Sequence, residues 1–191
     1  MSSGGEPIRL TAPFPPEAVA LLRAGDRVLL SGTIYTARDA AHRRLTELLG
    51  RGERLPVDLR GQVIYYVGPT PAPPGRPIGA AGPTTSGRMD PYTPALLEYG
   101  IAAMIGKGMR SPEVVAAIVA HHAIYFAAIG GAGALMSTCI RSAEVAAWAD
   151  LGPEAIYRLQ VENMPLIVVN DTLGGDLYRT APKQWAVQAE A

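Results

Sequence analysis

Short apolar runs and helical spacings of apolar residues alternate along the chain as far as about residue 170. Runs of apolar and β-branched residues predict strands, whereas apolar residues three and four positions apart predict helices. The predicted strands are 8–10, 26–34, 62–67, 102–105, 124–129, 156–161 and 166–169, and the predicted helices are 16–22, 36–49, 93–99, 111–121 and 132–140. Strands and helices mix throughout, which indicates an α/β domain with a mixed sheet.

The composition is that of an ordinary globular chain, with 48% hydrophobic and 18% charged residues among 191. This length predicts a single domain over 1–191, in which 1–6 and about 180–191 are expected to be flexible. Lys+Arg and Asp+Glu both number 17, which argues against a broad nucleic-acid surface. The low charged fraction suggests that a partner covers part of the surface.

The sequence gives two indications of location. The single cysteine, Cys139, excludes an intrachain disulfide and fits a reducing compartment. The first residues lack the basic and apolar regions of a signal peptide, so a cytoplasmic location is expected. No charged residue lies between Glu113 and Arg141, but this stretch is rich in alanine and interrupted by glycines, which predicts buried helix and strand rather than a membrane span.

A long loop precedes the most informative segment of the chain. Residues 68–83 contain six prolines and four glycines, a composition that fits either a linker between domains or a functional loop. Gly82-Pro-Thr-Thr-Ser-Gly-Arg-Met-Asp90 follows, with hydroxyl residues between two glycines and Arg88 two positions on. Glycine-rich turns can form anion-binding nests, and a guanidinium matches a carboxylate or phosphate in two-pronged geometry.

Arg38 is the second candidate because it breaks a local rule. Thr36-Ala-Arg-Asp39 resembles a capping box, with Thr36 as the predicted N-cap. Arg38 would then lie in the first helical turn, where the macrodipole disfavours a cation but favours an anion beside it. A solvated ion pair with Asp39 is the alternative. His42 lies one turn later on the same face and could share the site.

Lys107 lies between glycines, directly after an apolar strand. The carboxyl end of such a strand is where ligands favour binding in open α/β sheets, although a simple turn lysine has the same spacing. Arg38, Arg88 and Lys107 together would suit a small polyanionic substrate.

Two further patterns point less clearly to a site. Gly130-Gly-Ala-Gly133, followed by Asp150, partly matches a dinucleotide-binding turn, but close packing of strand and helix explains it better. His121, His122 and Cys139 lack a fourth ligand and a recognisable spacing, so no metal site is predicted in this chain.

Four ordered blocks together resemble a known family, the β subunit or C-terminal domain of iron–sulfur class I fumarases and L-tartrate dehydratases. The blocks are Gly32-Thr-Ile-Tyr-Thr-Ala-Arg-Asp-Ala-Ala-His42, Tyr65-Tyr-Val-Gly-Pro69, Gly82-Pro-Thr-Thr-Ser-Gly-Arg-Met-Asp90 and Gly106-Lys-Gly108. The resemblance extends from about residue 10 to 178, and the nine-residue loop is its most specific part.

The resemblance implies a three-layer β/β/α swivelling domain that pairs with a larger α subunit. That partner would hold a [4Fe–4S] cluster with one open iron site, and further dimerisation of the α/β complex is expected. The family's substrate-binding cations correspond to Arg38, Arg88 and Lys107, and its proposed catalytic threonine to Thr84.

The implied activity is a hydro-lyase reaction, the reversible hydration of fumarate to malate. The cluster iron would assist departure of the hydroxyl, and the three cations would stabilise charge on a carboxylate. Thr84 would be the base, or a hydroxyl with a structural role only. L-tartrate dehydratase, a mesaconate-type hydratase and a non-catalytic anion-binding or assembly module remain as alternatives.

Overall fold

The computed structural model describes residues 6–186, and the ends at 1–5 and 187–191 lie outside the described residues. Two of its elements, η1 and η2, are short 3-10 helices. The elements in chain order are β1 Ile8–Ala12, α1 Pro16–Ala20, β2 Arg27–Thr36, α2 Asp39–Gly50, β3 Val63–Tyr65, η1 Ser86–Met89, α3 Thr93–Tyr99, β4 Ala103–Gly106, α4 Pro112–Ala120, β5 Ile124–Ala127, α5 Gly133–Thr138, β6 Ile140–Ala147, η2 Ala149–Glu154, β7 Ile156–Asn170 and α6 Leu177–Trp185.

Within residues 6–186, seven strands form one mixed sheet in the order β1-β2-β3-β4-β5-β7-β6. An additional antiparallel pairing between β2 and β7 closes a ring through β3, β4 and β5. β2, β3, β4 and β5 run parallel to one another, so their carboxyl ends lie at one edge. That edge carries the candidate residues.

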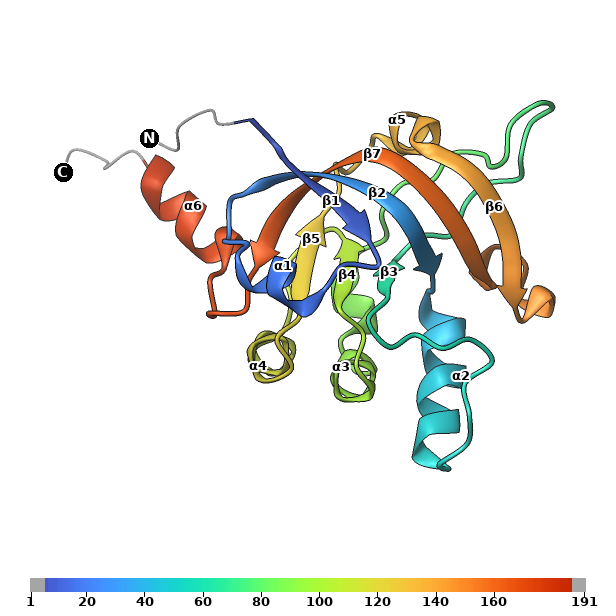
Figure 1. The fold of residues 1–191 in the computed structure, drawn as a ribbon, viewed down its shortest axis with the longest axis horizontal. Helices are drawn as coiled ribbons and strands as arrows, with labels where there is room; N and C mark the ends of the chain where they lie inside the picture. Colours follow the sequence, from blue (N-terminus) through green and yellow to red (C-terminus); the bar gives the residue numbers. More distant parts are fainter. Residues whose placement is uncertain (1–5, 187–191) are drawn as a thin grey trace.

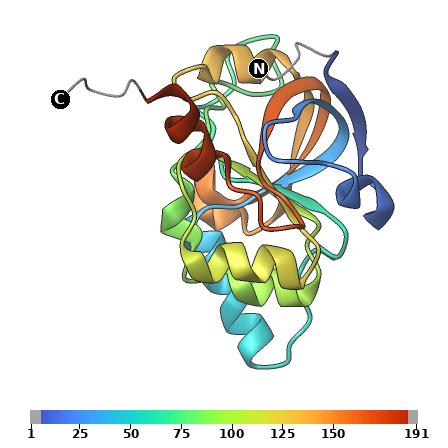
Figure 2. The same ribbon diagram turned by 90° about the vertical axis from the view of Figure 1, so that its left-hand side faces the viewer.

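The chain forms three layers (Figure 1). The long strands β2 and β7 arch with β1 and β6 over β3, β4 and β5, and α2, α3 and α4 lie on the opposite side of these three strands. Figure 2 shows the same order of layers from the side. The predicted β/β/α arrangement with a mixed sheet is confirmed.

Alternation along β3 explains why both faces of the middle layer are buried. Val63 and Tyr65 belong to the core between the two β layers, whereas Ile64 and Tyr66 belong to the core beneath the helices. The same alternation places Met104 and Tyr125 on the helix side. Strands buried on both faces are expected to be continuous apolar runs, and these are.

The structure differs from the predicted elements at several points; one of them is the start of α2, which begins at Asp39 because β2 continues to Thr36. β6 begins at Ile140, where the sequence predicted the end of a helix. The two late strands are one strand, β7, of 15 residues. Residues 180–185, expected to be part of a flexible end, belong to helix α6. The apolar stretch between Glu113 and Arg141 forms α4, β5 and α5. No helix in residues 6–186 is long and apolar enough to cross a membrane.

Candidate functional site

The carboxyl edge of the parallel strands brings the four predicted site residues into one region. Arg38 follows β2 by two positions, and Lys107 follows β4 directly. Thr84 and Arg88 belong to the loop after β3, which returns to this edge. The position of this loop is fixed by backbone hydrogen bonds rather than by a regular strand.

The segment 84–86 lies between the ends of β3 and β4 as an added extended piece. The amide of Thr84 donates to the carbonyl of Tyr66 at 2.7 Å, and the amide of Lys107 donates to the carbonyl of Thr84 at 3.2 Å. The amide of Ser86 donates to the carbonyl of Lys107 at 2.8 Å. Thr84 and Lys107 are therefore held side by side, although 23 positions separate them in the sequence.

Arg38 is the N-cap residue of α2, which corrects the predicted cap. Thr36 is the last residue of β2, and its hydroxyl donates to the carbonyl of Ala155 at 3.2 Å and accepts from the amide of Tyr157 at 3.0 Å. Because β2 continues to Thr36, the helix begins two residues later than a cap at Thr36 requires. Arg38 still lies at the helix start, without a capping side chain of its own.

Glu154 supplies the missing cap from a distant segment. Its Oε2 accepts from the amide of Ala40 at 2.9 Å, and its Oε1 lies 3.4 Å from Nη2 of Arg38. A carboxylate at this place satisfies a free helix N–H group and complements the macrodipole. The same side chain holds the Arg38 guanidinium against the helix start. No sequence pattern indicated Glu154.

Asp39 joins the two candidate arginines. Its Oδ1 accepts from Nε of Arg88 at 2.9 Å, and its Oδ2 lies 3.8 Å from Nε of Arg38. The ion pair of Arg38 with Asp39, the alternative considered for Arg38, is thus present. Nε of Arg38 and Oδ2 of Asp39 are nevertheless buried without a hydrogen-bond partner among the described residues. The two guanidiniums converge on one carboxylate while keeping unused donor capacity.

Gly68 explains how Arg38 fits in this place. A Cβ at Gly68 would lie 3.0 Å from Cδ of Arg38 and 3.3 Å from the carbonyl oxygen of Pro153. The Arg38 side chain is 21% exposed, compared with 51% for Arg88. Arg38 is therefore held firmly, whereas the Arg88 side chain is more exposed although it also contacts Asp39.

His42 is fully buried beneath this cluster. Its Nδ1 lies 2.9 Å from the carbonyl oxygen of Arg38, and its ring packs edge-on to Tyr66 with centroids 5.1 Å apart. Burial lowers the pKa of the imidazole to about 4, against the opposing effect of the Arg38 carbonyl. His42 is therefore neutral near pH 7 and donates through Nδ1, while Nε2 is unpartnered in the described part. It supports the Arg38 backbone rather than adding a charge.

The glycine-rich turn after β5 packs closely against the loop that precedes Thr84. The carbonyl of Gly133 accepts from the amide of Ala81 at 3.0 Å, and a Cβ at Gly133 would lie 3.1 Å from the amide nitrogen of Gly82. A Cβ at Gly130 would lie 3.6 Å from Cδ of Lys107. Asp150, the acidic residue of the dinucleotide alternative, pairs instead with Arg44 at 2.7 Å. The turn forms one wall beside Lys107.

The described residues contain no group of three or more His, Cys, Asp or Glu side chains that could hold a metal ion. Cys139 is half-buried at the end of α5, and burial raises the pKa of its thiol. His121 and His122 lie exposed after α4. These residues fit neither a metal ion nor an iron–sulfur cluster, which requires several thiolates.

An apolar cavity of about 370 Å³ lies between α6 and β7. Its lining residues are Ala127, Ile167, Val169, Leu177, Tyr178, Ala181 and Pro182. None of them is charged, so the cavity does not suit a polyanion. The charged edge of the sheet remains the candidate site.

Comparison with known proteins finds a matching family and several similar proteins. The family described as Fumarase C-terminus matches residues 2–181. The chain is 38% identical to fumarate hydratase 1, mitochondrial, of Leishmania major over 175 residues. These residues cover 90% of this chain and 32% of that protein. It is 40% identical over 155 residues to the anaerobic class I fumarate hydratase of Escherichia coli strain K12. The aligned residues cover 80% of this chain and 28% of that protein.

A third relative has about the length of this chain. It is the putative L(+)-tartrate dehydratase subunit beta of Methanocaldococcus jannaschii, 37% identical over 172 residues, which cover 87% of this chain and 88% of that protein. By contrast, the chain spans about a third or less of the two fumarate hydratases.

Proposed function

The chain belongs to the fumarase C-terminus family, and from this premise we propose that it is the β subunit of a two-subunit hydro-lyase that hydrates fumarate reversibly to malate. The convergence of Arg38 and Arg88 on the carboxylate of Asp39 carries this proposal. Two guanidiniums that both approach one carboxylate support the proposal that this place also suits a carboxylate of the substrate. The similarity to a tartrate dehydratase subunit beta over 88% of its length supports the subunit assignment.

The charges of the cluster suit a dicarboxylate. Arg38, Arg88 and Lys107 bring three positive charges, against two negative charges from Asp39 and Glu154. A guanidinium binds a carboxylate through two parallel N–H donors, and Lys107 adds a compact charge from the neighbouring turn. The substrate is proposed to bind with one carboxylate near the arginines and to be oriented by Lys107.

Removal of water from malate breaks a C–H bond and a C–O bond and forms the C=C bond. As the proton leaves, negative charge grows on the adjacent carboxylate, where preorganised cations stabilise the transition state more than the ground state. We assign this role to Arg38, Arg88 and Lys107. The Thr84 hydroxyl is the proposed proton acceptor, which requires activation by its surroundings because an alcohol is a poor base.

A metal ion could assist departure of the hydroxyl, but the described residues contain no set of side chains that could hold one. We therefore propose that a [4Fe–4S] cluster is held by an α subunit and faces Arg38, Arg88 and Lys107 of this chain. The low charged fraction of 18% agrees with a surface that is partly covered. A cytoplasmic location and dimerisation of the α/β complex are part of the same proposal.

The test is to purify the chain anaerobically with an α subunit from the same organism and to assay fumarate, mesaconate and L-tartrate. Hydration of fumarate by the complex, with no activity of either subunit alone, is the expected result. Activity confined to L-tartrate would replace the fumarase assignment by the tartrate dehydratase alternative. Failure to bind any α subunit, together with binding of dicarboxylates by this chain alone, would favour the anion-binding module.

A further inference from the structure

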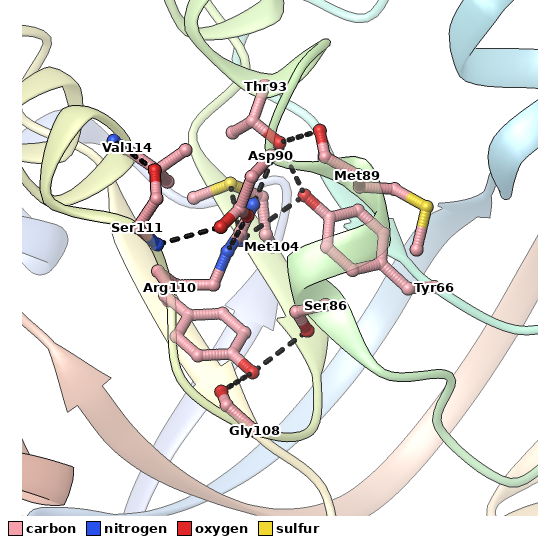
Figure 3. A network of polar contacts seen from close by, with 11 residues as sticks. Tyr66, Ser86, Met89, Asp90, Thr93, Met104, Gly108, Arg110, Ser111 and Val114 are labelled. Atoms are coloured by element: carbon pink, nitrogen blue, oxygen red, sulfur yellow. Dashed lines mark hydrogen bonds and ion pairs between the residues drawn. The ribbon is translucent and has the colours of Figure 1, made fainter.

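A buried polar network lies on the helix side of β4 and β5 (Figure 3). Its centre is Arg110, whose side chain is 0% exposed. Nε of Arg110 donates to Oδ1 of Asp90 at 2.7 Å, and Nη2 donates to Oγ1 of Thr93 at 2.8 Å. The guanidinium also lies over the rings of Tyr66 and Tyr125, 5.4 and 5.0 Å from their centroids.

Asp90 is the end of the loop that carries Thr84 and Arg88. Besides accepting from Arg110, its carboxylate accepts through Oδ2 from the amide of Ser111 at 2.7 Å. Arg110 and Ser111 follow Lys107 in the turn after β4. The carboxylate of Asp90 therefore ties the end of one site loop to the end of the other.

A second connection joins the same two loops nearer to the site. The hydroxyl of Tyr125 donates to the carbonyl of Gly108 at 2.8 Å and lies 2.9 Å from Oγ of Ser86. A Cβ at Gly106 would clash with Oγ of Ser86 and would lie 3.0 Å from Tyr66, so glycine is required for this approach. The two connections lie on either side of Arg88 in one loop, and in the other loop both follow Lys107, at 108 and at 110–111.

We infer that Arg110 and Asp90 are a positioning pair for the proposed reaction, which fixes Thr84 and Arg88 relative to Lys107. A buried charge is costly unless it is paired and hydrogen-bonded, and replacement of such a pair by apolar residues often stabilises a protein. Fold stability alone therefore does not account for an ion pair at this place. The position of the pair between the two site loops accounts for it, because catalysis depends on alignment within about 1 Å. The kinetic part of this inference rests on the proposed function.

The first experiment measures anchoring and does not depend on activity. Hydrogen exchange is followed in 84–90 and 107–110 of the full chain, in the form in which it purifies, for wild type, Arg110→Lys and Tyr125→Phe. Tyr125→Phe removes only one hydroxyl and is the milder variant. Exchange in both loops is expected to rise together in each variant, and more in Arg110→Lys. Unchanged exchange in either loop would overturn the inference.

The second experiment measures turnover in the α/β complex at a temperature where all variants are folded. Arg110→Lys is expected to lower kcat about 100-fold, while KM changes less because Arg38 still binds a carboxylate. Val28→Ala is the control for reduced stability. Val28 lies in β2, is 1% exposed, and belongs to the core between the two β layers, away from Arg110. A kcat of Arg110→Lys equal to that of Val28→Ala would refute a positioning role.

A double-mutant cycle with Arg88→Ala separates positioning from general damage. If Arg110 acts partly through Arg88, the effect of Arg110→Lys on kcat is smaller in the Arg88→Ala background than in wild type. Full additivity would contradict the inference. If the wild-type complex is inactive on fumarate, mesaconate and tartrate, the proposed function fails, and the exchange measurements alone decide whether Arg110 anchors the two loops.

Discussion

The buried imidazole of His42 makes the stability of the fold depend on pH. In the native chain burial lowers the pKa of His42 to about 4, whereas in the unfolded chain it has its usual value of 6.5. Between these values the unfolded state binds the proton and the native state does not. Stability from the neutral imidazole is therefore fully present above pH 6.5 and is lost as the pH falls toward 4.

The magnitude follows from the difference in pKa. Each pKa unit corresponds to about 1.4 kcal/mol, so His42 contributes a slope of about 1.4 kcal/mol per pH unit in this window. Over the full difference of pKa it amounts to about 3 kcal/mol, which is a large part of the stability of a domain of this size.

The assay is urea unfolding of wild type and His42→Asn at a series of pH values between 4.5 and 7.5. The asparagine amide stands near Nδ1 and can donate to the carbonyl of Arg38, which His42 contacts at 2.9 Å. Other groups titrate in both proteins, so the difference between their free energies of unfolding isolates His42. The difference should shrink as the pH falls from 6.5. A difference that is independent of pH would refute the reasoning.

Three substitutions at the site give further predictions. Arg88→Lys keeps the charge but loses the two-pronged geometry, so turnover by the complex should fall by at least about 10-fold; near-wild-type kinetics would argue against a direct role. Glu154→Ala should lower the free energy of unfolding in urea by about 1 kcal/mol, because the cap on Ala40 is lost. Glu154→Gln should retain most of this stability and lose only the pairing with Arg38. Equal losses in the two variants would contradict the capping role. Gly68→Ala should displace Arg38 and raise KM for fumarate, with circular dichroism as the control for folding, and an unchanged KM would show that the Arg38 position is not critical.

The middle layer of the fold was predictable because its strands are buried on both faces. β3, β4 and β5 are short apolar runs, which are typical of parallel strands buried on both faces. β6 was not predicted because most of its residues are exposed and it lies at the sheet edge, so no apolar alternation marks it. β7 was predicted as two strands because Asn163, with a φ of 50°, and Pro165 interrupt its pattern. Its pairing with β2 maintains it as one strand.

The site was predictable as far as it depends on local chemistry. Arg38 stood out as a cation at a helix start, and the glycines beside Lys107 indicated a turn at a strand end. Glu154 and Arg110 could not be found in this way. Glu154 caps a helix that lies 114 positions earlier in the chain, and Arg110 contacts Asp90 only because two loops meet in the folded protein. Such pairings depend on the tertiary structure and leave no local pattern.

The most direct test of the proposed dicarboxylate site is a structure of the anaerobically purified α/β complex with malate bound. The account predicts one carboxylate of malate within hydrogen-bond distance of Arg38 and Arg88, Lys107 beside the ligand, and the Thr84 hydroxyl facing the carbon that loses its proton. Malate bound without contact to any of these four residues would contradict it.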